Sequence, residues 1–106
     1  MAERIHASHI LLMYAGSESS SADRSKEDAL AEISGLRDQL TEGADFAALA
    51  EKHSDCASAA SGGELGEFAK GEMVPEFEEA AFTLKPGEIS AAVETGFGFH
   101  LIRRTA

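Results

Sequence analysis

Two strand-like runs near opposite ends of the chain constrain the fold most. The first, residues 5–14, reads Ile-His-Ala-Ser-His-Ile-Leu-Leu-Met-Tyr and carries apolar side chains at both alternating sets of positions. A short run that is apolar on both faces is typical of a central strand in a sheet covered on both sides. His9 is then expected on the opposite face from Ile10 and Leu12. The second run, residues 98–104, holds another histidine, His100.

Two helices are predicted between these runs. Ser25, followed three residues later by Asp28, resembles an acidic capping box that begins a helix, and Gly43 supplies its end. Asp45 can cap a second helix over residues 46–53. The first helix is supported by apolar residues at helical spacing, namely Ala29, Leu30, Ile33, Leu36 and Leu40.

The middle of the chain is rich in small residues. Residues 56–63 predict a short helical turn, and residues 64–68 predict a brief strand in which Gly66 allows close packing. Pro75 is well placed in the first turn of another helix that extends to about Leu84.

The last part of the chain predicts a turn and two strands. Residues 85–88, Lys-Pro-Gly-Glu, favour a turn because proline presets φ at its second position and glycine tolerates the next. Residues 89–93 and 98–104 then predict two strands joined by residues 94–97. The order of elements indicates an α+β domain with helices around a small, mostly antiparallel sheet.

Length and charge narrow the function. The 106 residues, of which 43% are hydrophobic, predict one soluble domain over residues 1–106. A net charge of −10 repels phosphate backbones, so no nucleic-acid partner is expected. Acidic residues such as Glu76, Glu78 and Glu79 favour a solubilising surface over a site for basic clients, although basic clients stay possible partners.

Several classes of site and location are disfavoured. The single cysteine, Cys56, forms no internal disulfide, and no run approaches the ~20 apolar residues of a membrane span. With no apolar leader at the N-terminus, we expect a cytoplasmic protein, although a domain cut from a longer exported protein would look the same. We also expect a monomer. His6 and His9 are spaced so that a strand sends them to opposite faces, and we expect no metal. His53 ends a helix, where a surface cap is the simpler interpretation.

Six ordered blocks of sequence resemble the parvulin-type peptidyl-prolyl cis/trans isomerases. The resemblance covers nearly the whole chain and implies a four-stranded antiparallel sheet surrounded by about four helices, with the first and last strands adjacent at its centre. The matching blocks are residues 7–11 (Ala-Ser-His-Ile-Leu), 46–56 (Phe-Ala-Ala-Leu-Ala-Glu-Lys-His-Ser-Asp-Cys), 62–66 (Gly-Gly-Glu-Leu-Gly), 71–77 (Gly-Glu-Met-Val-Pro-Glu-Phe), 87–90 (Gly-Glu-Ile-Ser) and 95–102 (Thr-Gly-Phe-Gly-Phe-His-Leu-Ile).

The resemblance also implies an active site. The paired histidines of the family match His9 and His100, its cysteine or aspartate position matches Cys56, and the threonine of the same hydrogen-bond network matches Thr95. The proline pocket matches Leu65, Met73 and Phe77, with Phe68 nearby. Two positions depart from many relatives, because Val74 and Phe97 replace polar side chains and predict a more apolar pocket mouth.

The implied reaction needs no cofactor. Rotation about an X-Pro bond crosses a barrier of ~18–20 kcal/mol without making or breaking a covalent bond, so a catalyst must hold the ring and stabilise a twisted amide. We expect the histidines to fix the polarity of Cys56, whose thiol or thiolate destabilises the planar amide. Alternatively, the histidines only stabilise the sheet as a buried pair.

Two rival functions stay open. A catalytically weak module could bind proline-containing peptides as a chaperone. A hydrolase could use Cys56 as a nucleophile, although no oxyanion-hole motif is evident.

The loop of residues 14–24 predicts no phosphate requirement. Relatives that select phosphorylated segments place a basic cluster there, whereas this loop carries Glu18 and Asp23 against Arg24, with Lys26 just beyond. One arginine cannot offset that acidity and the global charge. The expected substrates are X-Pro bonds in unfolded or flexible proteins.

Overall fold

The computed structural model describes residues 4–17 and 24–106. Within them the chain forms four strands, three α-helices and one 3-10 helix. Glu18 and Asp23, the acidic residues on which the prediction of no phosphate requirement partly depends, lie outside the described residues. The elements in chain order are β1 (Arg4–Leu12), α1 (Lys26–Thr41), α2 (Phe46–His53), η1 (Ala57–Ser61), β2 (Glu64–Ala69), α3 (Pro75–Thr83), β3 (Val93–Thr95) and β4 (Gly98–Arg104).

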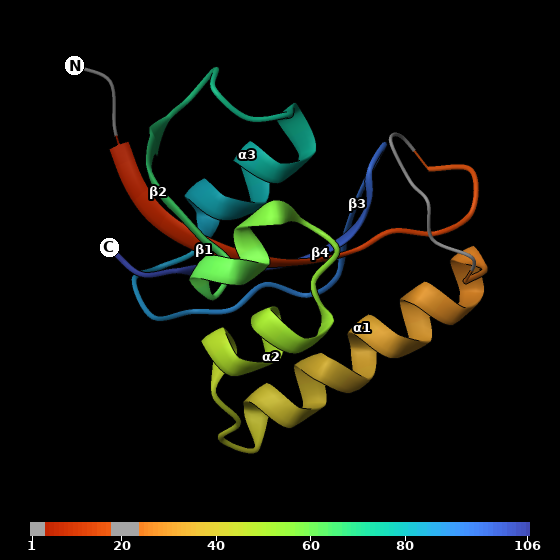
Figure 1. Cartoon of the computed structure of the whole chain (residues 1–106). Helices are drawn as coiled ribbons and strands as arrows, with labels where there is room; N and C mark the ends of the chain where they lie inside the picture. Colours follow the sequence, from red (N-terminus) through yellow and green to blue (C-terminus); the bar gives the residue numbers. More distant parts are fainter. Residues whose placement is uncertain (1–3, 18–23) are drawn as a thin grey trace.

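The strands form one antiparallel sheet in the order β2-β1-β4-β3. The first and last strands are therefore adjacent at its centre, as predicted. Helix α3 lies over one face of the sheet, and α1 and α2 lie over the other (Figure 1). The α+β architecture is confirmed.

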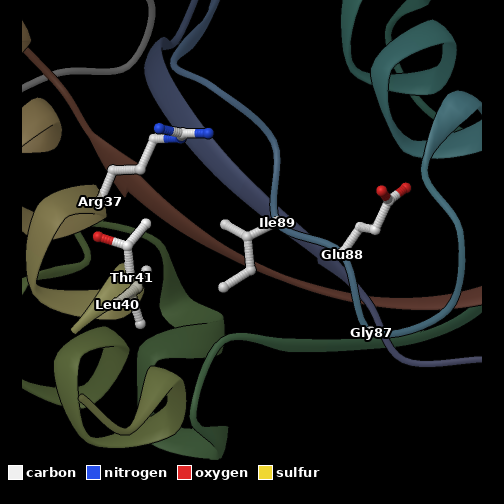
Figure 2. A pocket seen from close by; sticks show the side chains of 6 residues that line it. All are labelled: Arg37, Leu40, Thr41, Gly87, Glu88 and Ile89. Carbon is white, nitrogen blue, oxygen red and sulfur yellow. The ribbon is translucent and has the colours of Figure 1, made fainter. Parts of the chain in front are cut away.

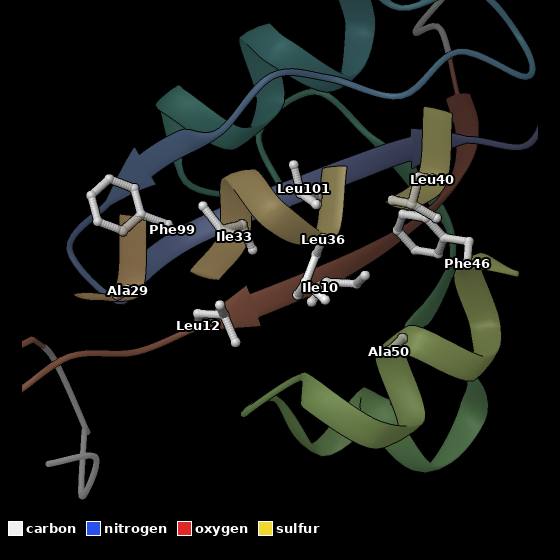
Figure 3. Close-up of a cluster of buried hydrophobic side chains, with 10 residues drawn as sticks. All are labelled: Ile10, Leu12, Ala29, Ile33, Leu36, Leu40, Phe46, Ala50, Phe99 and Leu101. Carbon is white, nitrogen blue, oxygen red and sulfur yellow. The ribbon is translucent and has the colours of Figure 1, made fainter. Parts of the chain in front are cut away.

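The face under α1 and α2 holds the larger core. Figure 3 shows side chains of the two central strands meeting those of both helices. Alternation along β1 sends Ile10 and Leu12 to this face, as predicted, and along β4 it sends Phe99 and Leu101 there. The helices contribute Ala29, Ile33, Leu36, Leu40, Phe46 and Ala50.

The helix caps follow the sequence. Ser25 precedes α1, and its hydroxyl accepts a hydrogen bond from the Asp28 N–H at 3.0 Å. Asp45 caps α2 in the same way, accepting from the Ala48 N–H at 2.9 Å. Pro75 occupies the first turn of α3, where its missing N–H costs nothing.

The strand predicted over residues 89–93 is wrong. Regular pairing begins only at Val93, and Ile89 makes an isolated bridge to Arg103. Ser90 explains the interruption, because its hydroxyl accepts a hydrogen bond from the Ile102 N–H at 3.0 Å while its carbonyl accepts one from Arg37 Nε at 3.1 Å. A side chain thus takes the place of a backbone carbonyl in the ladder.

The close packing expected at Gly66 occurs instead at Gly63. Apart from residues 65–67 themselves, no atom of the described residues lies within 4 Å of the position that a Cβ of Gly66 would occupy. This residue follows a bulge in which Leu65 is the extra residue opposite β1. At Gly63, φ is +81°, and a Cβ would overlap the carbonyl oxygen of His9. Gly63 therefore lets the chain pass directly against β1 beside His9.

No helix within residues 4–17 and 24–106 combines the length and apolar character needed to cross a membrane.

Candidate active site

His9 and His100 meet on the face of the sheet that α3 covers. The register pairs His9 with Ile102 and Leu11 with His100, so the two histidines are diagonal neighbours on adjacent strands. Diagonal positions are still within reach of ring side chains. Their imidazoles stack with centroids 5.3 Å apart, and the two Nδ1 atoms are separated by 3.1 Å.

Thr95 extends this pair at its outer end. Thr95 Oγ1 lies 2.7 Å from His100 Nε2 and accepts a hydrogen bond from the Phe97 N–H at 3.2 Å. The resemblance implies that Thr95 belongs to the hydrogen-bond network of the histidines, and the structure places it at one end of that network. The imidazoles contact each other directly, because the diagonal register brings the two Nδ1 atoms together.

The contact between the two Nδ1 atoms ties the tautomers of the imidazoles to each other. When both rings are neutral, one Nδ1 atom carries a proton and the other accepts it, so the second ring carries its proton on Nε2. His100 Nε2 is bonded to Thr95 Oγ1. His9 Nε2, at the other end of this network, is a buried atom for which the described residues offer no hydrogen-bond partner.

Burial keeps both imidazoles neutral. His9 is 5% exposed and His100 is 4% exposed. Desolvation lowers the pKa of His9 to about 4. Desolvation, followed by repulsion from His9, lowers the pKa of His100 to about 3. The direct contact between the two Nδ1 atoms also requires that one of them carry no proton, so at least one of the two rings is neutral.

Phe77 forms the floor under both imidazoles. This residue of α3 is 3% exposed, and its ring meets His9 and His100 edge-to-face with centroids 5.5 and 5.3 Å away. Leu65, Met73 and Val74 pack against the same cluster but are only half-buried. They offer apolar surface that a ligand could reach beside the network.

Phe68 and Phe97 lie differently from the other predicted pocket residues. Phe68 is 1% exposed and packs against Phe77, with centroids 6.1 Å apart, so it supports the floor from below. Phe97 is half-buried in the turn between β3 and β4, where its N–H holds Thr95. No described contact joins the Phe97 ring to the apolar cluster.

Cys56 is held beside β1 by its neighbours. It is half-buried and precedes η1. On one side the Asp55 N–H donates to the Leu11 carbonyl at 2.7 Å, and on the other the His9 N–H donates to the Gly63 carbonyl at 2.9 Å. Within the described part of the chain, no hydrogen bond joins the thiol to either imidazole.

Comparison with known proteins decides the family. The family model described as "Rotamase: PPIC-type PPIASE domain" matches residues 9–106, which include all the site residues above. The chain belongs to the parvulin family of peptidyl-prolyl isomerases. It is therefore an enzyme, a peptidyl-prolyl cis/trans isomerase.

Relatives of this parvulin have different lengths. The peptidyl-prolyl cis-trans isomerase Pin1 of Digitalis lanata is 42% identical over 114 residues, which cover 97% of each chain. The chaperone SurA of Nitrosospira multiformis is 44% identical over 103 residues, which cover 97% of this chain and 22% of that protein. The solution structure of TbPIN1 superposes with a TM-score of 0.91 at 40% identity, covering all of both chains.

A hollow lies beside the core under α1 and α2, on the other face of the sheet from the imidazoles. It has a volume of about 320 Å³ and opens between the end of α1 and residues 87–89 (Figure 2). Leu40 and Ile89, two of its lining residues, belong to the core under α1 and α2. The Arg37 side chain beside it is engaged with the Ser90 carbonyl. This hollow is thus remote from the imidazole network.

Within residues 4–17 and 24–106, no group of three or more His, Cys, Asp or Glu side chains could hold a metal ion. His6 is exposed and lies 3.3 Å from Glu67, whereas His9 is buried against Phe77. The predicted separation of these two histidines is confirmed.

Proposed function

We propose that this parvulin isomerises X-Pro bonds in unfolded or flexible protein segments and requires no phosphate on its substrate. The observation that carries the proposal is the neutral chain Thr95–His100–His9, buried against Phe77 and bordered by half-buried apolar side chains. Residues 1–106 act in this proposal as one catalytic domain.

Each group has a task in the twisted amide. Leu65, Met73 and Val74 hold the proline ring, with the flexible thioether of Met73 filling gaps. Phe97 borders the mouth of this pocket, and Phe68 supports its floor. An amide twisted out of conjugation loses its partial double bond, so a dry apolar surface favours it over the planar, charge-separated form.

The polar groups act on the carbonyl. Cys56 lies at the edge of the site, where its sulfur opposes the polarity of the planar amide. His9, His100 and Thr95 form an oriented, uncharged wall that keeps water and mobile charge away from the bond. Preorganised dipoles of this kind need no reorganisation as the bond rotates.

Phosphate independence is supported by the charges near the loop of residues 14–24. Arg24 pairs with Asp55 at 2.5 Å and with Glu32 at 3.3 Å. Lys26 pairs with Glu94 at 2.8 Å, and Glu94 also accepts a hydrogen bond from the Tyr14 hydroxyl. A phosphate would have to displace these carboxylates.

A panel of short peptides that differ only in the residue before proline tests this proposal. In a protease-coupled or NMR exchange assay, we expect kcat/KM for phosphoserine-proline to be no higher than for glutamate-proline. The reason is that the net negative charge of the protein repels a phosphate group. Lys26→Gln is the matched control and should leave that ratio unchanged. Turnover of the phosphoserine peptide more than about tenfold faster than that of both the serine and glutamate peptides would refute phosphate independence.

The same panel examines basic clients. Glu76 and Glu79 are exposed on α3, the helix that carries Phe77. Their field favours peptides with Lys or Arg near the proline, and we expect such peptides to bind more tightly at low salt than at high salt. We further propose that the protein is cytoplasmic and monomeric. Light scattering at assay concentration gives its molar mass and tests whether it is a monomer.

A proline-peptide-binding chaperone is the second candidate function. It is favoured by the match to a protein named chaperone SurA. This candidate requires peptide binding at Met73 with no acceleration of exchange. A Cys56 hydrolase is disfavoured because, within the described residues, no histidine nitrogen is hydrogen-bonded to the thiol to act as its base.

A further inference from the structure

The segment that leads into Cys56 docks on β1 through a set of hydrogen bonds that the resemblance does not account for. Strand β2 pairs with β1 only over Arg4–Ser8. Beyond that point the Leu11 N–H donates to Ser54 Oγ at 3.0 Å, and the Asp55 N–H donates to the Leu11 carbonyl at 2.7 Å. Ser54 and Asp55 therefore continue the sheet edge two residues past His9.

The Asp55 carboxylate fastens this docking. Its Oδ2 accepts a hydrogen bond from the Met13 N–H at 2.9 Å and an ion-paired one from Arg24 Nη1 at 2.5 Å. The same Arg24 Nη1 also donates to the Met13 carbonyl at 2.9 Å. The Asp55 and Arg24 side chains keep only 30% and 27% of their exposure, so the pair is partly shielded from water.

Cys56 itself makes no described hydrogen bond to β1. Its N–H makes only a long contact of 3.4 Å with Ser54 Oγ, and its carbonyl accepts a hydrogen bond from the Ala59 N–H at 2.9 Å. The 3-10 helix that follows, Ala57–Ser61, consists of Ala and Ser and has no side-chain cap. The next firm tie to β1 is Gly63, whose carbonyl accepts from the His9 N–H.

We propose that Asp55 is a positioning residue for catalysis, which sets the distance of the Cys56 thiol from His9 by clamping the preceding backbone to Leu11, Met13 and Arg24. This proposal rests on the proposed role of Cys56 at the active site. Arg24 is the second member of the clamp. The Arg24 guanidinium pairs with the Asp55 carboxylate and so holds the segment before Cys56 in place. Its charge is therefore neutralised by Asp55 and does not serve to bind an anionic substrate.

Asp55→Asn is the informative variant. Asparagine keeps an oxygen acceptor for the Met13 N–H but loses the charge that holds Arg24. We expect kcat to fall by about tenfold while the peptide dissociation constant changes less than about twofold, because the apolar pocket is untouched. Arg24→Gln should show the same pattern more weakly. Glu32→Gln is the matched control, since it removes the other carboxylate from Arg24 and should keep the original kcat.

A double-mutant cycle separates positioning from plain stability. In a Cys56→Ala background, Asp55→Asn should cost nothing further, because the clamp then has no thiol to place. A loss of the same factor in both backgrounds, or a folded Asp55→Asn protein with the original kcat, overturns the clamp and leaves the proposed function intact. Full activity of Cys56→Ala alone overturns the role of Cys56 and the clamp with it.

Discussion

Replacing Phe77 by Ala is expected to lower the free energy of unfolding by about 3–5 kcal/mol and to remove most of the isomerase activity. The ring is 3% exposed and supports both imidazoles from one side. Its loss leaves a cavity under the network, so the distance between the two Nδ1 atoms is no longer fixed. Urea unfolding and a peptide exchange assay measure the two effects.

Two further variants keep this prediction decisive. Phe77→Leu preserves more of the packing and should stay folded, with kcat/KM reduced by about tenfold or more, equivalent to about 1.4 kcal/mol of transition-state stabilisation. Phe82→Ala is the matched control. Phe82 lies on the same helix and packs against Phe68, with centroids 6.0 Å apart, but no described contact joins its ring to the histidines. If Phe77→Leu retained full activity, the floor would have no part in catalysis.

Acidification should destabilise the protein well before its carboxylates are all protonated. The pKa of His9 is lowered to about 4 and that of His100 to about 3, both by burial, whereas an unfolded histidine titrates near 6.5. Between these values the unfolded state binds more protons than the folded state. The contribution of the neutral imidazoles to the free energy of unfolding is therefore fully present above about pH 6.5. It falls as the pH drops, by up to about 1.4 kcal/mol per pH unit for each imidazole.

Urea denaturation at a series of pH values between 7 and 4.5 measures this slope. His100→Asn should flatten it, because one buried imidazole is gone. His6→Gln is the control and should keep it, since His6 is an exposed histidine of the same strand. A free energy of unfolding that stays constant from pH 7 to pH 5 would contradict the burial of two neutral imidazoles.

Much of the fold was readable from local signals. The central place of residues 5–14 followed from their two apolar faces, and the helix starts at Ser25, Asp45 and Pro75 followed from side chains that act within one turn. The interruption at Ser90 was not readable. It depends on Arg37 and Ile102, which are distant in sequence, so no local pattern encodes it.

The candidate site was predictable in membership but not in order. The resemblance named His9, His100 and Thr95. It did not indicate that the two imidazoles contact each other directly, nor that Thr95 lies at one end of their hydrogen-bond network. That order depends on the register of β1 against β4, which the sequence of either strand alone does not specify. The Asp55 clamp was missed because Asp55 looks like an ordinary loop acid until the structure brings Arg24 and Met13 to it.

NMR exchange spectroscopy on one short peptide containing a single X-Pro bond tests the central claim most directly. The measurement follows the cis/trans exchange rate of the peptide at substoichiometric enzyme, together with the methyl resonance of Met73 as a reporter of binding. We predict a large acceleration of exchange that falls strongly in Phe77→Leu and only weakly in Phe82→Ala. A shift of the Met73 resonance on peptide addition with no change in the exchange rate would contradict the account and leave a binding module.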